Sequence, residues 1–177
     1  MEDLTDKRIA FIATDYFEEV ELIEPLTQLR DMGAEVIVAA PHDETIQGLR
    51  HIELGQEVTV NTTIDQLDPS DYDAVVIPGG VVNADHLRID KMAQAFVQDM
   101  VDDKKPVAAI CHAPWLLVSS GLVDGKRLTS YPTLADDIRN AGGVWVDEEV
   151  VQDGWLITSR RPDDLPAFIA TIAGALA

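Results

Sequence analysis

Hydrophobic and polar positions in this chain follow two alternating patterns. Apolar residues form short continuous runs, which are typical of strands covered on both faces of a sheet. These runs comprise residues 8–13, 35–40, 74–77 and 106–111. After the first run, Leu22, Leu26 and Leu29 recur at helical spacing, which predicts an amphipathic helix that ends near Gly33. A strand, a helix and a strand in succession predict a βαβ unit with a right-handed crossover.

The remaining segments continue this alternation to the end of the chain. Residues 41–61 lack helical periodicity and contain Gly48 and Gly55, so a small hairpin is expected there. A loop is expected over residues 78–86. Further helices are expected at residues 90–102, up to 120, at 134–140 and at 163–176, and short strands at 144–146, 150–151 and 156–158. Together these elements predict one domain over residues 1–177, a three-layer α/β sandwich with a mostly parallel sheet.

The composition suits a single hydrophobic core and argues against two kinds of targeting segment. Hydrophobic residues make up 46% of the 177 residues, which is enough for one core. No stretch is long and apolar enough to span a bilayer, and the acidic, polar start over residues 1–8 does not resemble a signal peptide. We therefore expect a cytoplasmic protein. The single cysteine, Cys111, permits neither an internal disulfide nor a structural zinc site built from thiolates.

The charge of the chain is strongly negative. Thirty-two acidic residues face thirteen basic ones, which gives a formal net charge of −19 at pH 7. Long-range repulsion then opposes binding to nucleic acid or to an anionic membrane, so we expect neither as a partner. Because the acidic residues are scattered and few of the basic residues are lysine, the pattern fits a surface adapted to high salt in a halophilic host. An ordinary acidic protein fits it as well, and both interpretations stay open.

The most informative position is Cys111, which ends an apolar run and is followed by His112 and Pro114. A buried strand that passes directly into a helix, with Pro114 in the first turn, would place the thiol on a tight corner, a nucleophile elbow. Backbone N–H groups and the positive end of the helix dipole would then lower the pKa of the Cys111 thiol. A buried cysteine that serves only as a small hydrophobic residue is the alternative.

Three predicted loops should meet beyond the carboxyl ends of the parallel strands, where open α/β sheets bind their ligands. The first loop carries the carboxylates of Glu18 and Glu21, and the second carries Gly79 and Gly80. The third carries the thiol of Cys111 and the imidazole of His112. The glycines offer exposed amides, and the backbone N–H groups of Gly80 and His112 are the candidates to stabilise an oxyanion. A glutamate beside the thiolate would have a raised pKa and would transfer protons. Glutamates that only complement a helix N-terminus are the alternative.

His112 follows the cysteine directly, which limits how its ring can approach the thiol. A papain-like or amidotransferase-like triad needs a histidine far downstream of the cysteine, and no histidine follows His112. Such a triad is therefore absent within the chain. The carboxylate that orients His112 must come from elsewhere, and Asp85 is our candidate, with a plain loop carboxylate as the alternative. The other histidines, His42, His51 and His86, lie in polar segments and are expected to be solvated.

Six motifs, in order along the chain, resemble the PfpI branch of the ThiJ/PfpI superfamily. They span residues 17–22 (FEEVEL), 76–80 (VIPGG), 109–114 (AICHAP), 129–132 (TSYP), 136–142 (DDIRNAG) and 145–150 (WVDEEV). Each motif alone is weakly specific, but together they cover the chain nearly from end to end. The resemblance implies a flavodoxin-like sandwich and the activities for which this superfamily is known, namely those of an intracellular cysteine peptidase, a glyoxalase or a protein deglycase.

The resemblance also assigns roles to individual positions. It implies that Cys111 is the nucleophile and that His112 lies beside it. The pocket glutamates of the family correspond to Glu18 and Glu21. Tyr131, in the Ser-Tyr-Pro motif, is similar to a residue that lines the same pocket. No cofactor and no metal are implied.

An assembly of several subunits, a dimer or a hexamer, is a further implication of the resemblance. In PfpI-like assemblies the carboxylate that orients the histidine comes from a neighbouring subunit, and its counterpart here is Asp85. Two positions depart from the family pattern. Ala113 stands where many relatives have glycine, which is a mild change, and Asp85 is shorter than the glutamate of the hyperthermophilic peptidases. The shorter side chain puts the distance to His112, and with it peptidase activity, in question.

Three functions are consistent with these residues. The leading hypothesis is a cofactor-independent enzyme that acts on small reactive carbonyls, such as methylglyoxal or its adducts, through a hemithioacetal at Cys111. The second is an intracellular cysteine peptidase, which would use the same nucleophile and oxyanion donors on a peptide. The third is a stress protein that senses oxidants through Cys111 or binds unfolded chains. Because one superfamily fold hosts many activities, the choice rests partly on analogy.

Overall fold

The computed structural model describes residues 2–177, which are built around a seven-stranded sheet. Its strands are β1 (Arg8–Ile12), β3 (Glu35–Ala40), β6 (Thr62–Thr63), β7 (Ala74–Ile77), β8 (Val107–Ile110), β11 (Val150–Asp153) and β12 (Leu156–Ser159). In space they follow the order β11-β12-β8-β7-β1-β3-β6. All neighbouring pairs are parallel except β11 and β12, which are antiparallel. The prediction of a mostly parallel sheet is thus confirmed.

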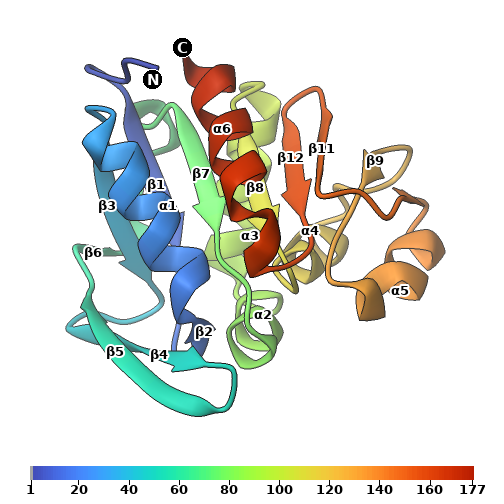
Figure 1. Cartoon of the computed structure of the whole chain (residues 1–177), viewed down its shortest axis with the longest axis horizontal. Coiled ribbons are helices and arrows are strands. Elements are labelled where there is room, and N and C mark those ends of the chain that lie inside the picture. Colours follow the sequence, from blue (N-terminus) through green and yellow to red (C-terminus); the bar gives the residue numbers. More distant parts are fainter. Residues whose placement is uncertain (1) are drawn as a thin grey trace.

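Helices cover both faces of this sheet and form the predicted three-layer sandwich (Figure 1). On one face lie α1 (Glu19–Asp31) and α6 (Leu165–Leu176), which pack against each other. On the other face lie α3 (Lys91–Asp102) and α4 (Pro114–Ser119). Within residues 2–177, no helix has the length and hydrophobicity that a membrane span needs.

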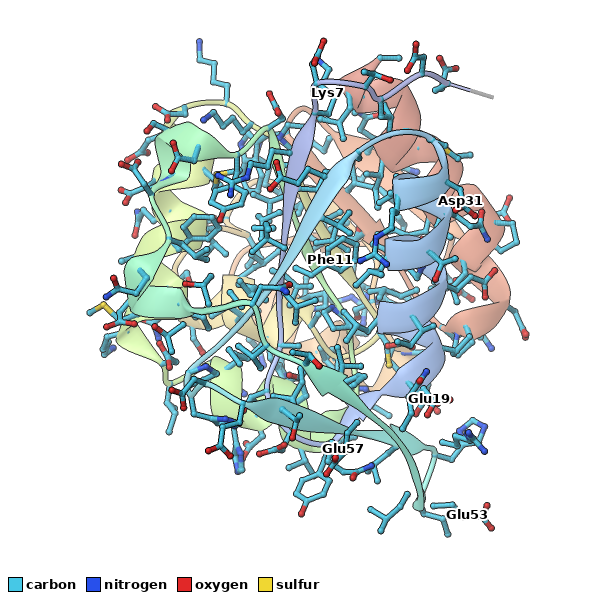
Figure 2. All side chains as sticks on the ribbon, turned by 90° about the vertical axis from the view of Figure 1, so that its left-hand side faces the viewer. Lys7, Phe11, Glu19, Asp31, Glu53 and Glu57 are labelled. Atoms are coloured by element: carbon cyan, nitrogen blue, oxygen red, sulfur yellow. The ribbon has the colours of Figure 1, made fainter. Side chains whose placement is uncertain are left out.

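The strands are buried on both faces because their side chains alternate between the two helix layers. Ile9 and Phe11 of β1 belong to the apolar cluster beneath α1 and α6, whereas Ala10 and Ile12 belong to the cluster beneath α3 and α4. Figure 2 shows Phe11 in the interior, between the sheet and α1. Burial on both sides explains why these strands are continuous apolar runs in the sequence.

A second, three-stranded sheet extends from the carboxyl end of the main sheet. It consists of β2 (Phe17–Glu18), β4 (Thr45–Arg50) and β5 (Glu53–Thr59), in the order β2-β4-β5. The strands β4 and β5 form the hairpin predicted for residues 41–61, and Glu53 marks its projecting tip in Figure 2. Glu19 accepts hydrogen bonds from Arg50 Nε and from Gln56 N–H, and so ties the hairpin to the start of α1.

Residues 78–86 differ from the predicted loop. The chain forms α2 (Val81–Leu87) directly after the two glycines, with Asn83, Ala84 and Leu87 buried. This helix has only seven residues, so its apolar spacing is too short to stand out in the sequence. Three small elements complete the fold at the edge beside β11, namely β9 (Arg127–Leu128), its parallel partner β10 (Val144–Trp145), and α5 (Ala135–Asn140).

The strand order places a topological switch point between β1 and β7. From β1 the chain moves to β3 on one side, and it later returns to β7 on the other side. The segments after β1, β7 and β8 all leave the sheet at the end that faces α2 and the hairpin (Figure 1). Since open α/β sheets bind ligands beyond the carboxyl ends of their strands at such a point, the site is expected there.

Candidate active site

Cys111 lies on a sharp corner between β8 and α4. Its backbone φ is +63°, in the left-handed region that residues other than glycine rarely adopt. Both sides of the corner are held, because Cys111 N–H donates to Ser159 O at 3.0 Å and Tyr131 N–H donates to Cys111 O at 2.8 Å. Pro114 begins α4 three residues later. The chain thus forms the predicted strand-to-helix elbow.

Glu21 is the carboxyl group that accompanies the thiol. It lies in the first turn of α1, is fully buried, and accepts a hydrogen bond on Oε2 from Gly79 N–H at 2.8 Å. A Cβ at Gly79 would lie 2.4 Å from Glu21 Oε2 and 2.6 Å from Cys111 Cβ, so only glycine fits between the two side chains. The other carboxyl oxygen, Oε1, is buried without a hydrogen-bond partner among the described residues. Carboxyl and thiol therefore share one small buried space.

The protonation state of Glu21 follows from this burial. Burial raises the pKa of Glu21 to about 8, and the negative charge of Glu18 acts in the same direction. The Gly79 N–H and the Cys111 side chain lower this pKa, but burial prevails. At neutral pH the carboxyl is therefore mostly protonated and can both donate and accept a hydrogen bond. Of the two glutamates that the sequence offered, the structure places Glu21 beside the thiol.

The pKa of the Cys111 thiol is raised, whereas the sequence predicts that it is lowered. Burial is the main cause, and the negative charge of an ionised Glu21 adds to it. The backbone N–H groups of Gly80 and His112 hydrogen-bond to the Cys111 thiol and lower this pKa, without outweighing burial. The helix that follows, α4, has only six residues, so its dipole offers little compensation. The resting site thus holds a neutral thiol beside a mostly neutral carboxyl.

His112 contacts the thiol directly. Its Nδ1 lies 3.1 Å from Cys111 Sγ, and its ring stacks on Tyr131 with the ring centroids 4.7 Å apart. Burial lowers the pKa of His112, so the imidazole is neutral and can accept a proton. On the other side of the ring, Nε2 lies 3.5 Å from Thr133 Oγ1. The ring is therefore placed between the sulfur and a hydroxyl, with an aromatic side chain stacked against it.

Asp85 does not reach this histidine within the chain. It is exposed on α2, and among residues 2–177 no carboxylate forms a hydrogen bond or an ion pair with His112. The role that the resemblance implies for Asp85 depends on a neighbouring subunit. It stays a prediction.

Glu18, Gly79 and Gly80 differ in what they contribute. The Glu18 carboxylate lines the pocket and accepts from His51 N–H at 3.2 and 3.3 Å, so it holds the hairpin tip. The sequence predicts that Gly79 binds substrate, but its N–H is engaged by Glu21 and is not free for an oxyanion. Gly80 has a φ of +92°, and a Cβ there would lie 2.8 Å from Glu18 N. Of these two glycines, it is Gly80 whose N–H is directed at the sulfur.

These groups open into a pocket of about 820 Å³. All three predicted loops line it, together with Tyr131. The hairpin tip and the segment after β12 add residues that the sequence analysis missed: Leu49, His51, Ile52, Arg161, Pro162 and Asp163. No local signal marks these positions, because they become neighbours of Cys111 only through the strand order and the fold of the hairpin. Among residues 2–177, no group of three or more His, Cys, Asp and Glu side chains is arranged to hold a metal ion.

Asn83 is a further residue that the sequence analysis missed. It is fully buried on α2, where its Oδ1 accepts from Thr14 N–H at 2.7 Å. Its Nδ2 donates to Pro78 O at 2.9 Å and to Gly79 O at 3.0 Å. Asn83 thereby ties the loop after β1 to the glycine turn that shapes the site. An asparagine on the buried face of a predicted helix would have pointed to this role, but residues 78–86 were expected to form a loop.

The sequence and the fold of this chain match those of known proteins. The DJ-1/PfpI family profile matches residues 7–175. The "Deglycase TK1284" of Thermococcus kodakarensis is 41% identical over 162 residues, which cover 92% of this chain and 95% of the relative. The "Putative cysteine protease YraA" of Bacillus subtilis is 39% identical over 163 residues, 92% of this chain and 94% of the relative. The crystal structure of Drosophila melanogaster DJ-1beta has a TM-score of 0.88 at 33% identity, over 97% of this chain and 90% of that one. This chain therefore belongs to the DJ-1/PfpI family, as an enzyme of the PfpI type.

Proposed function

We propose that this chain is a cofactor-independent enzyme of the glyoxalase and deglycase type, which acts on reactive carbonyls such as methylglyoxal, and on their adducts, through a hemithioacetal at Cys111. The observation that carries the proposal is the Cys111 thiol beside the protonated carboxyl of Glu21 in one buried space. A nucleophile next to a proton donor suits addition to a carbonyl, in which a new bond to carbon and a new hydroxyl form together. The similarity to a relative named a deglycase supports the proposal.

Addition requires the thiol proton to leave the sulfur. His112 Nδ1 lies 3.1 Å from Cys111 Sγ, and its neutral imidazole accepts that proton. The sulfur attacks the aldehyde carbon, the C=O π bond opens, and the oxygen takes a proton from the carboxyl of Glu21. The N–H groups of Gly80 and His112 are placed to stabilise negative charge at this corner. The product is a neutral hemithioacetal.

The remaining steps need water but no external oxidant. The ionised Glu21 removes the proton from the hemithioacetal carbon, and an enediol forms. Return of a proton to the neighbouring carbon gives a lactate thioester, in which one carbon has been oxidised and its neighbour reduced. Water then adds to the thioester carbon and gives a proton to the ionised Glu21, the C–S bond breaks, and the imidazolium of His112 returns its proton to the departing sulfur. Methylglyoxal and water thus become lactate, and the thiol is restored.

Lactate production from methylglyoxal by the purified chain tests this proposal. Cys111→Ala should abolish it, because no hemithioacetal can form. Glu21→Gln should lower kcat by about 10²-fold to 10⁴-fold, the usual contribution of a positioned acid–base group. Glu24→Gln is the matched control, because Glu24 lies on the same helix, outside the pocket, and contacts Gln28. Its activity should equal that of the wild type. Lactate formation that survives Cys111→Ala would refute the proposal.

Peptide hydrolysis is a second candidate, which the direct contact between Cys111 Sγ and His112 Nδ1 favours. A peptidase must also protonate the leaving amine, and an imidazole does this best when a carboxylate orients it and stabilises its charge. Within residues 2–177 His112 has no such carboxylate. This activity would therefore depend on Asp85 from a neighbouring subunit.

A further inference from the structure

Arg161 lies beside the nucleophile because of the strand order. The strand β12 pairs with β8 in parallel, with Ser159 opposite Ile110, the residue before Cys111. Two residues beyond Ser159, Arg161 has extended backbone, with φ −163° and ψ 172°, and precedes a short 3₁₀ turn. It lines the same pocket as Cys111 and His112. The strand pairing therefore brings Arg161 to the pocket that contains the thiol.

The two consecutive arginines of this segment, Arg160 and Arg161, differ in whether a carboxylate pairs with the guanidinium group. Arg160 donates to Asp164 through Nε and Nη2, at 2.9 Å each, and to Asp147 through Nη1 at 2.9 Å. Arg161 has no carboxylate within ion-pair distance among the described residues, and its Nε is buried without a hydrogen-bond partner. Because charged and buried polar groups are nearly always paired, a guanidinium that lines a pocket with no carboxylate partner and an unpaired Nε has donors left to pair with an anionic group of a ligand.

We infer that Arg161 binds a carboxylate of the substrate, so that among reactive carbonyl compounds the pocket prefers those that also carry a carboxylate over uncharged ones such as methylglyoxal. The carbonyl part of this inference rests on the proposed function, whereas the binding of the anion does not. A guanidinium offers two parallel N–H groups, which match the two oxygens of a carboxylate. Glu18 and Asp163 also line the pocket, and their negative charges disfavour a doubly charged phosphate more than a singly charged carboxylate. A carboxylate is therefore the oxyanion that fits this site.

Alkylation of Cys111 by two reagents of equal size measures this selectivity without any turnover. Iodoacetate carries a carboxylate and iodoacetamide a neutral amide, and with both the C–S bond forms as iodide leaves. The ratio of the two rate constants cancels any change in thiolate fraction, because both reagents meet the same thiol. With a single cysteine in the chain, all alkylation reports on Cys111.

Substitutions of Arg161 should change the ratio of the two alkylation rates. Arg161→Gln should lower the ratio of the iodoacetate rate to the iodoacetamide rate by about fivefold to tenfold, as expected for loss of one charge-assisted pair. Arg161→Lys should retain part of the preference. Arg30→Gln is the matched control for net charge, because Arg30 is exposed at the end of α1, outside the pocket. Its ratio should equal that of the wild type. An unchanged ratio in Arg161→Gln would overturn the inference.

The unmodified chain provides a second measurement that does not depend on how the variants fold. Lactate should slow the reaction of Cys111 with iodoacetamide, whereas lactamide at the same concentration should not. Equal protection by both, or none by either, would overturn the inference. Stronger protection by inorganic phosphate than by lactate would make this a phosphate site and refute the carboxylate assignment. Because neither measurement needs lactate to be formed from methylglyoxal, failure of the proposed function and failure of this inference are distinguishable.

Discussion

The chemistry of Glu21 is linked to that of Cys111 because ionisation of either group is unfavourable in the buried space that they occupy together. Burial raises the pKa of both groups, and the negative charge of an ionised Glu21 would raise the pKa of Cys111 further. The glycine between them removes the side chain that would otherwise separate them. A carboxyl that keeps its proton at neutral pH can donate this proton to a carbonyl oxygen and take another from carbon. In the proposed mechanism the two residues therefore act as one acid–nucleophile pair.

The pH dependence of stability tests the raised pKa of Glu21. The folded chain keeps this proton at pH values where the unfolded chain has already lost it. The free energy of unfolding of the wild type should therefore fall, relative to that of Glu21→Gln, as pH rises from the ordinary value of 4.5 to about 8. The total change should be about 5 kcal/mol, at roughly 1.4 kcal/mol per pKa unit. Urea denaturation across this range measures it.

The control for this experiment is again Glu24→Gln, whose stability should run parallel to that of the wild type at every pH. Below pH 4.5 and above about 8 the difference between wild type and Glu21→Gln should be constant, because both states then bind equal numbers of protons. A difference that stays the same from pH 4.5 to pH 8 would contradict the raised pKa.

At the scale of elements, α2 holds the glycine turn in place. Its Asn83 satisfies three backbone groups, from Thr14, Pro78 and Gly79, none of which belongs to a regular strand or helix. Without this amide, the segments after β1 and β7 would each carry unpaired backbone groups in a buried place. Through one side chain, the short helix therefore positions the Gly79 N–H that donates to Glu21 and the neighbouring Gly80 N–H that is directed at the sulfur.

Replacement of Asn83 should weaken both the fold and the site. Asn83→Ala leaves Thr14 N–H and Pro78 O buried without partners, while Gly79 O keeps the hydrogen bond from Glu18 N–H, and should lower the free energy of unfolding by roughly 3 kcal/mol. His86→Ala, on the exposed side of the same helix, should change it by less than about 0.5 kcal/mol. Denaturation in urea gives both values. Equal stabilities of the two variants would show that the hydrogen bonds of Asn83 contribute nothing to the fold.

At the scale of the whole molecule, the mouth of the pocket is apolar and open. Tyr16, Ile52, Val81 and Val82 line it with exposed side chains, although the chain as a whole is strongly acidic. Apolar groups gathered on the surface of a charged protein are typical of an association surface. Asp85 lies on α2, the helix that also carries Val81 and Val82. This placement supports the prediction that a second copy covers the mouth and brings its own Asp85 toward His112.

Mixing two inactive chains tests this assembly. If Asp85 acts across a subunit boundary on His112, Cys111→Ala and Asp85→Ala should each lack the activity that depends on His112. Dissociated and reassembled together in equal amounts, they should regain about a quarter of wild-type activity, because in a symmetric dimer half of the mixed dimers' sites are intact. Measurement of activity before and after mixing tests whether Asp85 acts across the subunit boundary. An Asp85→Ala variant with full activity would contradict a role for this carboxylate.

The element types were predictable because each depends on a local pattern. The runs at 8–13 and 74–77 formed strands, and the spacing of Leu22, Leu26 and Leu29 formed a helix, since burial of one face or of both imposes these periods. The elbow at Cys111 was predictable for the same reason, as an apolar run that meets a proline. The helix α2 was not, because seven residues after a glycine pair carry too little periodicity.

The sequence by itself thus determined the sandwich, the family and the three loops that gather at the carboxyl end of the sheet around Cys111. Only the tertiary structure decided that Glu21, and not Glu18, shares the buried space with Cys111. It also decided that the pKa of the thiol is raised and that Arg161 lines the pocket with an Nε that is unpaired among residues 2–177. The physical reason is that desolvation and charge interactions depend on distances between residues far apart in the chain, which no local pattern records.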